Sequence, residues 1–368
     1  MIIKVLIIYL IIIIDITLSI TLSTSTTTSS SMTTIRQRIP RHIWLPLAES
    51  HSNIVHDLLY PKGDTNKQRL HHTKQHPIYN FLHTYYRYPI ADLKKYSPGM
   101  NVILDDINDN DIDKYFIRKY LHQEKDNSNS YIYKPIIPLQ ADGSKGWINI
   151  NRVKIILENT INRSPNFACF GLHEWAMLYS GRVNTLEASS SSSIYHKKNG
   201  NIINLEKPLD KHQDVPLRVT QEEIDDIVEG IGLHCTHYDA FRFFHPRSQP
   251  FNDVNPPLTR ETQHEYETPA CVHASMDIFK YAYQIYPFID SELLIDSIIL
   301  ALACRKVDML ASPYDVSQYV NDEPIRVETS EGRKRYIFEQ EKLIERATPI
   351  RQKLLALYSE VLDNSLKG

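Results

Sequence analysis

Residues 293–303 constrain the fold more than any other stretch, because only Asp296 and Ser297 interrupt their apolar sequence. A helix that is apolar almost all round is expected at the centre of a core, where other elements cover every side of it. The other clear patterns also predict helices, over residues 76–88, 151–162, 170–179, 220–231, 269–286, 291–306 and 339–362. The predicted fold class is therefore mainly α, a single compact helical domain.

Two local signals add detail to this prediction. Thr220 and Glu223 have the spacing of a capping box, which predicts that a helix starts here and ends at Gly232. Two short runs on either side of a Thr-Ser-Glu-Gly loop predict a small β-hairpin near residues 325–338.

Composition divides the chain into a leader and one domain. Residues 1–35 hold a short apolar run followed by serine and threonine, which is typical of a signal or transit-type leader. This leader predicts the secretory pathway or a plastid-type organelle, or the cytoplasm if it is a mispredicted start, and membrane contact only through the leader. Residues 36–368 are expected to form the helical domain, with the densest core at 165–368 and a disordered serine-rich insertion at 187–200.

Glycine is scarce in this chain, with only 11 among 368 residues. Neither a Rossmann fingerprint nor a P-loop occurs, so the two common glycine-rich phosphate-binding loops are excluded. The formal net charge of −3 gives no support for nucleic acid as a partner, although Arg333–Arg335 with Tyr336, and Tyr85–Tyr88, are aromatic and basic patches. Any site must be built from side chains on packed helices.

Polar residues interrupt four apolar segments, at residues 167–177, 234–244, 271–277 and 308–315. Polar groups among core-type residues need partners, so convergence of these segments would create a pocket with imidazoles, carboxylates and aromatic walls. The candidate catalytic residues are His173, Glu174, His237, Asp239, His273, Asp277, Asp308 and Asp315. The candidate substrate-binding residues are Trp175, Tyr238, Arg242, Phe243 and Tyr314. A purely structural interpretation pairs Asp277 with Lys280 or Lys306 and places Asp308 and Asp315 at helix ends.

A metal site is the alternative for the same residues. His234 and His237 are three residues apart, and His273 and Asp277 are four apart on one helix face, spacings that can present ligands. The alternative ligand set is His173, His234, His237, His273 and Asp277, holding zinc or iron. No C-x-x-C or H-E-x-x-H motif occurs, and the four cysteines fit small buried residues, so no cofactor is favoured.

The four segments resemble a family of bacterial and algal proteins that carry the name 3-methyladenine DNA glycosylase. The resemblance rests on FGLHEWAM at 170–177, THYDAFRFF at 236–244, HASMD at 273–277 and DM with ASPYD within 308–315, and it spans about residues 75–355. It implies a hydrolase that cleaves an N-glycosidic bond, with an alkylated purine in DNA as the substrate.

Each kind of candidate residue has an expected role in this reaction. Trp175, Tyr238 and Phe243 would enclose a base, and Asp239 or Asp277 would activate water with help from His173, His237 or His273. The partner would then be a small aromatic ligand or a nucleobase-containing substrate. Two alternatives stay open: a metal-dependent enzyme that uses the histidine and aspartate cluster, and a non-catalytic helical protein that binds a small ligand.

Overall fold

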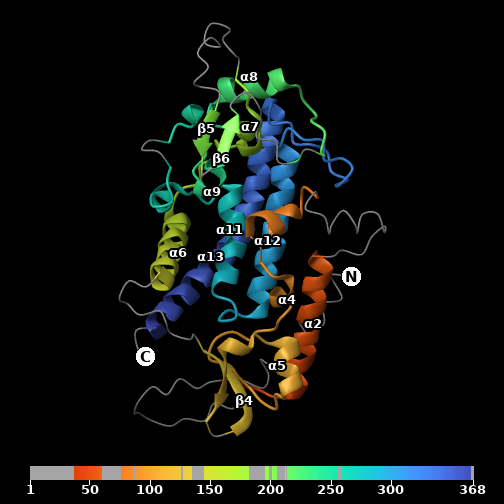
Figure 1. Cartoon of the computed structure of the whole chain (residues 1–368), viewed down its shortest axis with the longest axis vertical. Coiled ribbons are helices and arrows are strands. Elements are labelled where there is room, and N and C mark those ends of the chain that lie inside the picture. Colours follow the sequence, from red (N-terminus) through yellow and green to blue (C-terminus); the bar gives the residue numbers. More distant parts are fainter. Residues whose placement is uncertain are drawn as a thin grey trace. The chain divides into compact units, whose positions relative to one another are not determined.

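The computed structural model describes residues 37–59, 76–86, 88–125, 127–134, 145–181, 195–198, 201–204, 212, 214–254 and 258–365. By contacts, the chain divides into two units, Met1–Arg36 and Gln37–Gly368. The predicted leader therefore lies outside the described residues. The second unit is mainly α, as predicted, with a small sheet (Figure 1).

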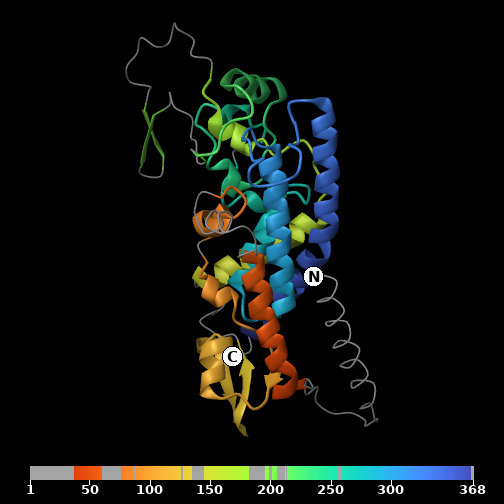
Figure 2. The same cartoon turned by 90° about the vertical axis from the view of Figure 1, so that its right-hand side faces the viewer.

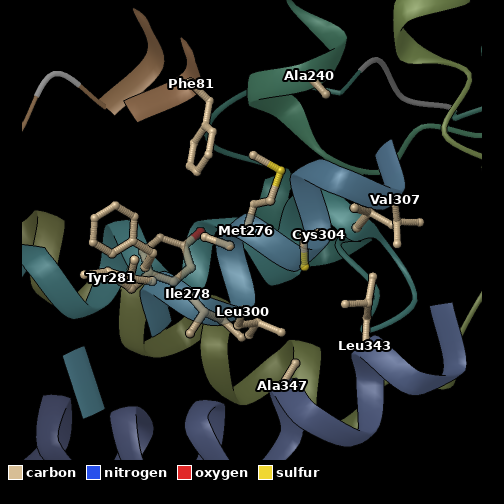
Figure 3. Packing of buried hydrophobic residues seen from close by; sticks show 14 of the residues in the cluster. Phe81, Ala240, Met276, Ile278, Tyr281, Leu300, Cys304, Val307, Leu343 and Ala347 are labelled. Atoms are coloured by element: carbon tan, nitrogen blue, oxygen red, sulfur yellow. The ribbon is translucent and has the colours of Figure 1, made fainter. Parts of the chain in front are cut away.

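Three long helices pack on one another in the large core: α11 (Val272–Gln284), α12 (Ser291–Ala311) and α13 (Ser330–Ser365). Figure 3 shows their side chains meeting, with Ile278 and Tyr281 from α11, Leu300 and Cys304 from α12, and Leu343 and Ala347 from α13. Helix α6 (Lys145–Asn162) packs on α13 and on α10 (Gln263–Tyr266). Helix α2 (Arg41–Leu59) lies beside α12 (Figure 2).

Helix α12 has the central position that its sequence predicts. Asp290 caps its N-terminus by accepting a hydrogen bond from the Leu293 amide at 2.7 Å. Leu294, Ile298 and Ala301 on its middle turns are all completely buried. The helix ends at Ala311, two residues before Pro313.

The capping box is also confirmed. Thr220 accepts a hydrogen bond from the Glu223 amide at 3.2 Å, and the Glu223 carboxylate accepts one from the Thr220 amide at 2.7 Å. Helix α8 (Gln221–Ile231) starts there and ends at Gly232, whose φ of 77° suits glycine. Instead of one helix over residues 76–88, the structure has the short π-helix η1 (Leu82–Tyr86), and then α4 (Ile90–Leu93).

A four-stranded sheet and a second, smaller core were not predicted. The strands are β1 (Arg38–Ile39), β2 (Ile103–Leu104), β3 (Leu121–Glu124) and β4 (Asn127–Tyr133), in the order β1-β2-β4-β3. Only the β1–β2 pairing is parallel within this sheet. Trp44, Phe116 and Tyr133 fill the core beside it, with α5 (Asp109–Tyr115).

The remaining described elements are short. They are η2 (Arg118–Tyr120), α7 (His173–Leu178), α9 (Tyr238–Phe241), η3 (Gln249–Phe251) and the antiparallel pair β5 (Tyr195–Lys198) and β6 (Asn201–Asn204). Strand β5 lies in the stretch predicted to be disordered, 187–200, whose other residues are outside the described part. Among the described helices, none is long and apolar enough to cross a membrane.

The predicted hairpin near residues 325–338 is wrong, because α13 already starts at Ser330. Thr329 begins this helix: its hydroxyl accepts a hydrogen bond from the Gly332 amide at 3.0 Å. A Cβ on Gly332 would lie 1.7 Å from the carbonyl oxygen of Arg326. The glycine is therefore needed for close approach of the chain at a helix start and not for a hairpin turn. Helix α13 then continues through Pro349.

Candidate functional site

A cavity of about 130 Å³ lies where η1, α7, α9 and α11 meet. Its lining combines aromatic, titratable and thioether side chains: Tyr85, Tyr86, Tyr88, His173, Met177, His237, Asp239, Ala240, Arg242, Phe243, His273, Met276, Asp277, Lys280 and Arg305. Three of the four apolar segments that polar residues interrupt contribute to it directly. The structure therefore brings three of the four segments together in one pocket, and the fourth, 308–315, contributes only Asp308 beside His173.

Aromatic rings form one wall of the cavity. Tyr85 and Phe243 pack edge to face with ring centroids 5.6 Å apart, and Tyr86 stacks on Tyr88 at 5.6 Å with nearly parallel planes. The Arg242 guanidinium lies 4.1 Å from the centroid of Phe243. Rings presented in this way can hold a flat ligand through stacking and edge contacts.

His237 and Asp277 form a buried pair on the floor. The Nδ1 atom of His237 accepts a hydrogen bond from the Ala240 amide at 3.2 Å, so a proton on this ring sits on Nε2. This Nε2 atom lies 3.2 Å from the carboxylate of Asp277. Burial lowers the pKa of His237, but Asp277 and Glu267 outweigh it, so the pKa is raised overall.

The carboxylates of Asp277 and Asp239 are fully engaged. Asp277 accepts hydrogen bonds from Tyr86 at 3.0 Å and Lys280 at 2.8 Å, as well as facing His237. Asp239 accepts from Lys280 at 2.6 Å and from Arg242 at 2.9 Å. Burial raises the pKa of each carboxyl, but Lys280 and His237 together outweigh it and both pKa values are lowered. These two groups therefore hold the cations at the cavity, and their oxygens already have partners.

Arg305, which also lines the cavity, is the centre of a cluster of buried charges. Its Nη1 atom lies 3.2 Å from Glu174 and 2.6 Å from Asp308, and its Nε donates to the Pro77 carbonyl at 3.0 Å. Its Nη2 lies 3.2 Å from the ring of His212. Both carboxylates are 0 % exposed, so the guanidinium balances charge that water cannot reach.

His173, His273 and Asp308 come together between this cluster and the cavity. His173 Nδ1 lies 3.2 Å, and His273 Nε2 3.8 Å, from Asp308 Oδ1. The two imidazole rings are 4.2 Å apart between centroids and nearly perpendicular. Burial lowers the pKa of His273 strongly, and the neighbouring His173, His237 and Arg305 lower it further.

Several predicted site residues lie elsewhere. His234 pairs with Asp253 at 2.6 Å on the surface, and so it does not join the other predicted metal ligands. Asp315 accepts a hydrogen bond from the Ser317 amide at 3.0 Å in a turn and does not line the cavity. Tyr238, the first residue of α9, does not line it either.

Two aromatic residues predicted to bind substrate are structural. The indole of Trp175 is completely buried and donates to the carbonyl of Ala311 at 2.9 Å. Tyr314 is 1 % exposed and packs against the His212 ring. Tyr336, predicted to be part of a basic patch, is also buried, and it packs on Gly171.

Sequence reasoning missed Arg305 and His212 as members of the site. Arg305 carried a usable signal, because it lies three residues before Asp308 near the end of an otherwise apolar helix. An arginine in such a position needs a buried acidic partner. Lys280 was predicted correctly as the partner of Asp277, whereas Lys306 pairs with Asp322.

Comparisons of this chain with protein-family models, with curated proteins and with solved structures find no match. The geometry of the cavity and the sequence resemblance are therefore the basis for the function proposed below.

Proposed function

We propose that this protein is a hydrolase that cleaves an N-glycosidic bond, with a ring of the nucleobase class held in the cavity. The main support is one observation: an aromatic wall and a floor of histidines backed by buried carboxylates occur in the same cavity. The resemblance to the 3-methyladenine DNA glycosylase family favours the same bond class, with an alkylated purine as the ring.

Hydrolysis of such a bond makes three demands. The carbon–nitrogen bond breaks with its electron pair going to the ring nitrogen, the oxygen of a water bonds to the sugar carbon, and one water proton ends on the departing nitrogen. The enzyme must hold the ring, take a proton from the water and stabilise the electron pair that passes to the ring nitrogen. Tyr85 and Phe243 suit the first demand, and the cations Lys280 and Arg242 suit the third.

His273 is the group best placed to activate the water. Its side chain is 15 % exposed, against 6 % for His173 and 3 % for His237. Its Nε2 faces Asp308, a carboxylate that can orient the ring. We therefore assign to His273 and Asp308 the role that the sequence suggested for Asp239 or Asp277, whose oxygens are occupied by Lys280 and other donors.

The test is release of free base. Purified protein is incubated with DNA treated with a methylating agent and, separately, with N-methylated purine nucleosides, and the released base is measured by chromatography. We expect release, and a loss of about 10²–10⁴-fold in rate for His273→Ala. Phe243→Leu is expected to raise KM more than it lowers kcat, since it removes stacking and not a reacting group.

His234→Ala is the matched control, because it removes a histidine that pairs with Asp253 outside the cavity. It should keep the wild-type rate. No release above buffer by folded protein from any of these substrates would refute the proposal. Binding of the base without cleavage, unchanged in His273→Ala, would instead favour the non-catalytic ligand-binding protein.

A further inference from the structure

His173 and His273, which line the cavity, and Asp308 beside them present potential metal-ligand atoms to one another. One atom each from His173, His273 and Asp308 lies within 4.8 Å of the other two. Within this set, Asp308 Oδ1 is 3.2 Å from His173 Nδ1 and 3.8 Å from His273 Nε2. The residues come from α7, α11 and α12, so three packed helices fix their positions.

Two of these atoms are buried without a hydrogen bond. His173 Nδ1 and Asp308 Oδ1 have no hydrogen-bond partner among the described residues, although their side chains are 6 % and 0 % exposed. Leaving a buried polar atom unsatisfied is costly, and most buried polar atoms in proteins do have a partner. The two atoms lie 3.2 Å from each other, so one ligand could satisfy them together.

The opposite side of each of these two residues is already held in place. His173 Nε2 lies 3.2 Å from the carboxylate of Glu174, and the second oxygen of Asp308 accepts a hydrogen bond from Arg305 at 2.6 Å. Histidines that bind metals usually donate their other ring N–H to a carboxylate or carbonyl, which fixes the tautomer. The Glu174–His173 contact has this arrangement, so Nδ1 of His173 is the atom left to bind an ion.

We propose that His173, His273 and Asp308 bind one divalent transition-metal ion whose open coordination position faces the cavity. Zinc–nitrogen and zinc–oxygen bonds of about 2.0–2.2 Å place neighbouring ligand atoms roughly 3.0–3.5 Å apart. The observed 3.2 and 3.8 Å need only a small adjustment to meet this spacing. Two histidines and one carboxylate are a ligand set for catalytic zinc and also for ferrous iron.

The ion's use rests on the function proposed above, with one change: when the ion is bound, His273 acts on the water as a ligand of the ion and does not itself take the proton. A bound ion lowers the pKa of its water and so supplies the attacking hydroxide. Zinc fits this use best, because hydrolysis involves no change of oxidation state. The ligand set differs from the one predicted from sequence, since Asp308 replaces His234, His237 and Asp277.

Metal content and cobalt binding test the site without reference to activity. Protein purified without an affinity tag is analysed by elemental mass spectrometry, and chelator-treated protein is titrated with Co²⁺ while its visible absorption is recorded. We expect about one equivalent of zinc or iron, and about one of Co²⁺, in the wild type. His273→Ala and Asp308→Asn should reduce both to below about a tenth, while His234→Ala keeps both.

Circular dichroism shows whether each variant is folded, and His273→Ala tests the site even if Asp308→Asn does not fold. Folded wild type with less than about a tenth of an equivalent of metal, and without cobalt absorption, would overturn the inference. Metal that is lost in the variants, in a protein without glycosidic activity, supports the site and refutes the proposed function. Base release by folded wild type that binds neither zinc, iron nor Co²⁺ refutes the metal site and leaves the function standing.

Discussion

Replacing Arg305 with leucine tests the buried charge cluster most directly. The guanidinium lies 3.2 Å from Glu174 and 2.6 Å from Asp308, and both carboxylates are 0 % exposed. Removing one partner of a buried ion pair typically costs about 3–5 kcal/mol, because the other charge stays buried without compensation. Two carboxylates share this one arginine, so we expect Arg305→Leu to lower the free energy of unfolding by at least about 3 kcal/mol.

The measurement is urea unfolding followed by circular dichroism, in the presence of a chelator so that no metal ion replaces the lost charge. Lys306→Leu is the control, because this neighbouring cation pairs with Asp322 and both side chains are more than 40 % exposed. Such exposed ion pairs contribute about 0–1 kcal/mol to the free energy of unfolding. Without Arg305 the folded-state pKa values of Glu174 and Asp308 should rise. The difference in the free energy of unfolding between the variant and the wild type should therefore shrink as the pH falls and the two carboxylates take up protons.

Two results would contradict this reasoning. One is a decrease in the free energy of unfolding for Arg305→Leu that is no larger than the decrease for Lys306→Leu. The other is a loss that stays constant from neutral to acidic pH, since the penalty would then not come from unpaired carboxylates.

Three other predictions concern the fold. Burial lowers the pKa of His51 to about 4 from its usual 6.5, so between these pH values the folded state binds fewer protons than the unfolded state. The free energy of unfolding should therefore fall by about 3 kcal/mol as the pH drops from 6.5 to 4. In a pH series of urea titrations, His51→Gln should make this fall smaller. Gly332→Ala should lower the midpoint of thermal unfolding, because its Cβ would lie 1.7 Å from the Arg326 carbonyl oxygen. Gly230→Ala in α8 is the comparison: a Cβ there has nothing within 4 Å, so this change should raise the free energy of unfolding by about 0.5–1 kcal/mol. Equal effects of the two changes on stability would be evidence against the close approach at Gly332. Ile298→Ala, in the middle of α12, should cost about 2–5 kcal/mol in urea unfolding, and a cost below about 1 kcal/mol would contradict the central position of this helix.

Local signals were enough to predict the helices that have unambiguous sequence patterns. The capping box at Thr220 and the nearly uninterrupted apolar run of 293–303 need no information from elsewhere in the chain. The four-stranded sheet gave no such signal, because β1 and β2 have two residues each and are too short to show alternation. The Thr-Ser-Glu-Gly stretch fits both a hairpin turn and a helix start, and only the space around Gly332 separates the two.

For the site, the sequence predicted that the polar residues of different segments meet, but not which carboxylate pairs with which histidine. Polar residues within apolar segments had to meet partners, and His173, His237, His273 and Asp277 do line one cavity. Which carboxylate serves which histidine depends on helix packing, so Asp277 was predicted to act on water although it is held by Lys280. Trp175 was misassigned for a similar reason: only the fold shows that Ala311 accepts its N–H.

The contacts of Arg305 also carry a consequence for the order in which the chain folds. Its hydrogen-bond partners Pro77, Glu174 and His212 lie 228, 131 and 93 residues earlier in the sequence. During synthesis Glu174 therefore emerges long before the cation that allows it to leave water, and contacts of such long range form slowly. An N-terminal fragment that ends before α12 should keep this carboxylate solvated, so the floor of the cavity should be assembled only after nearly the whole chain has been made.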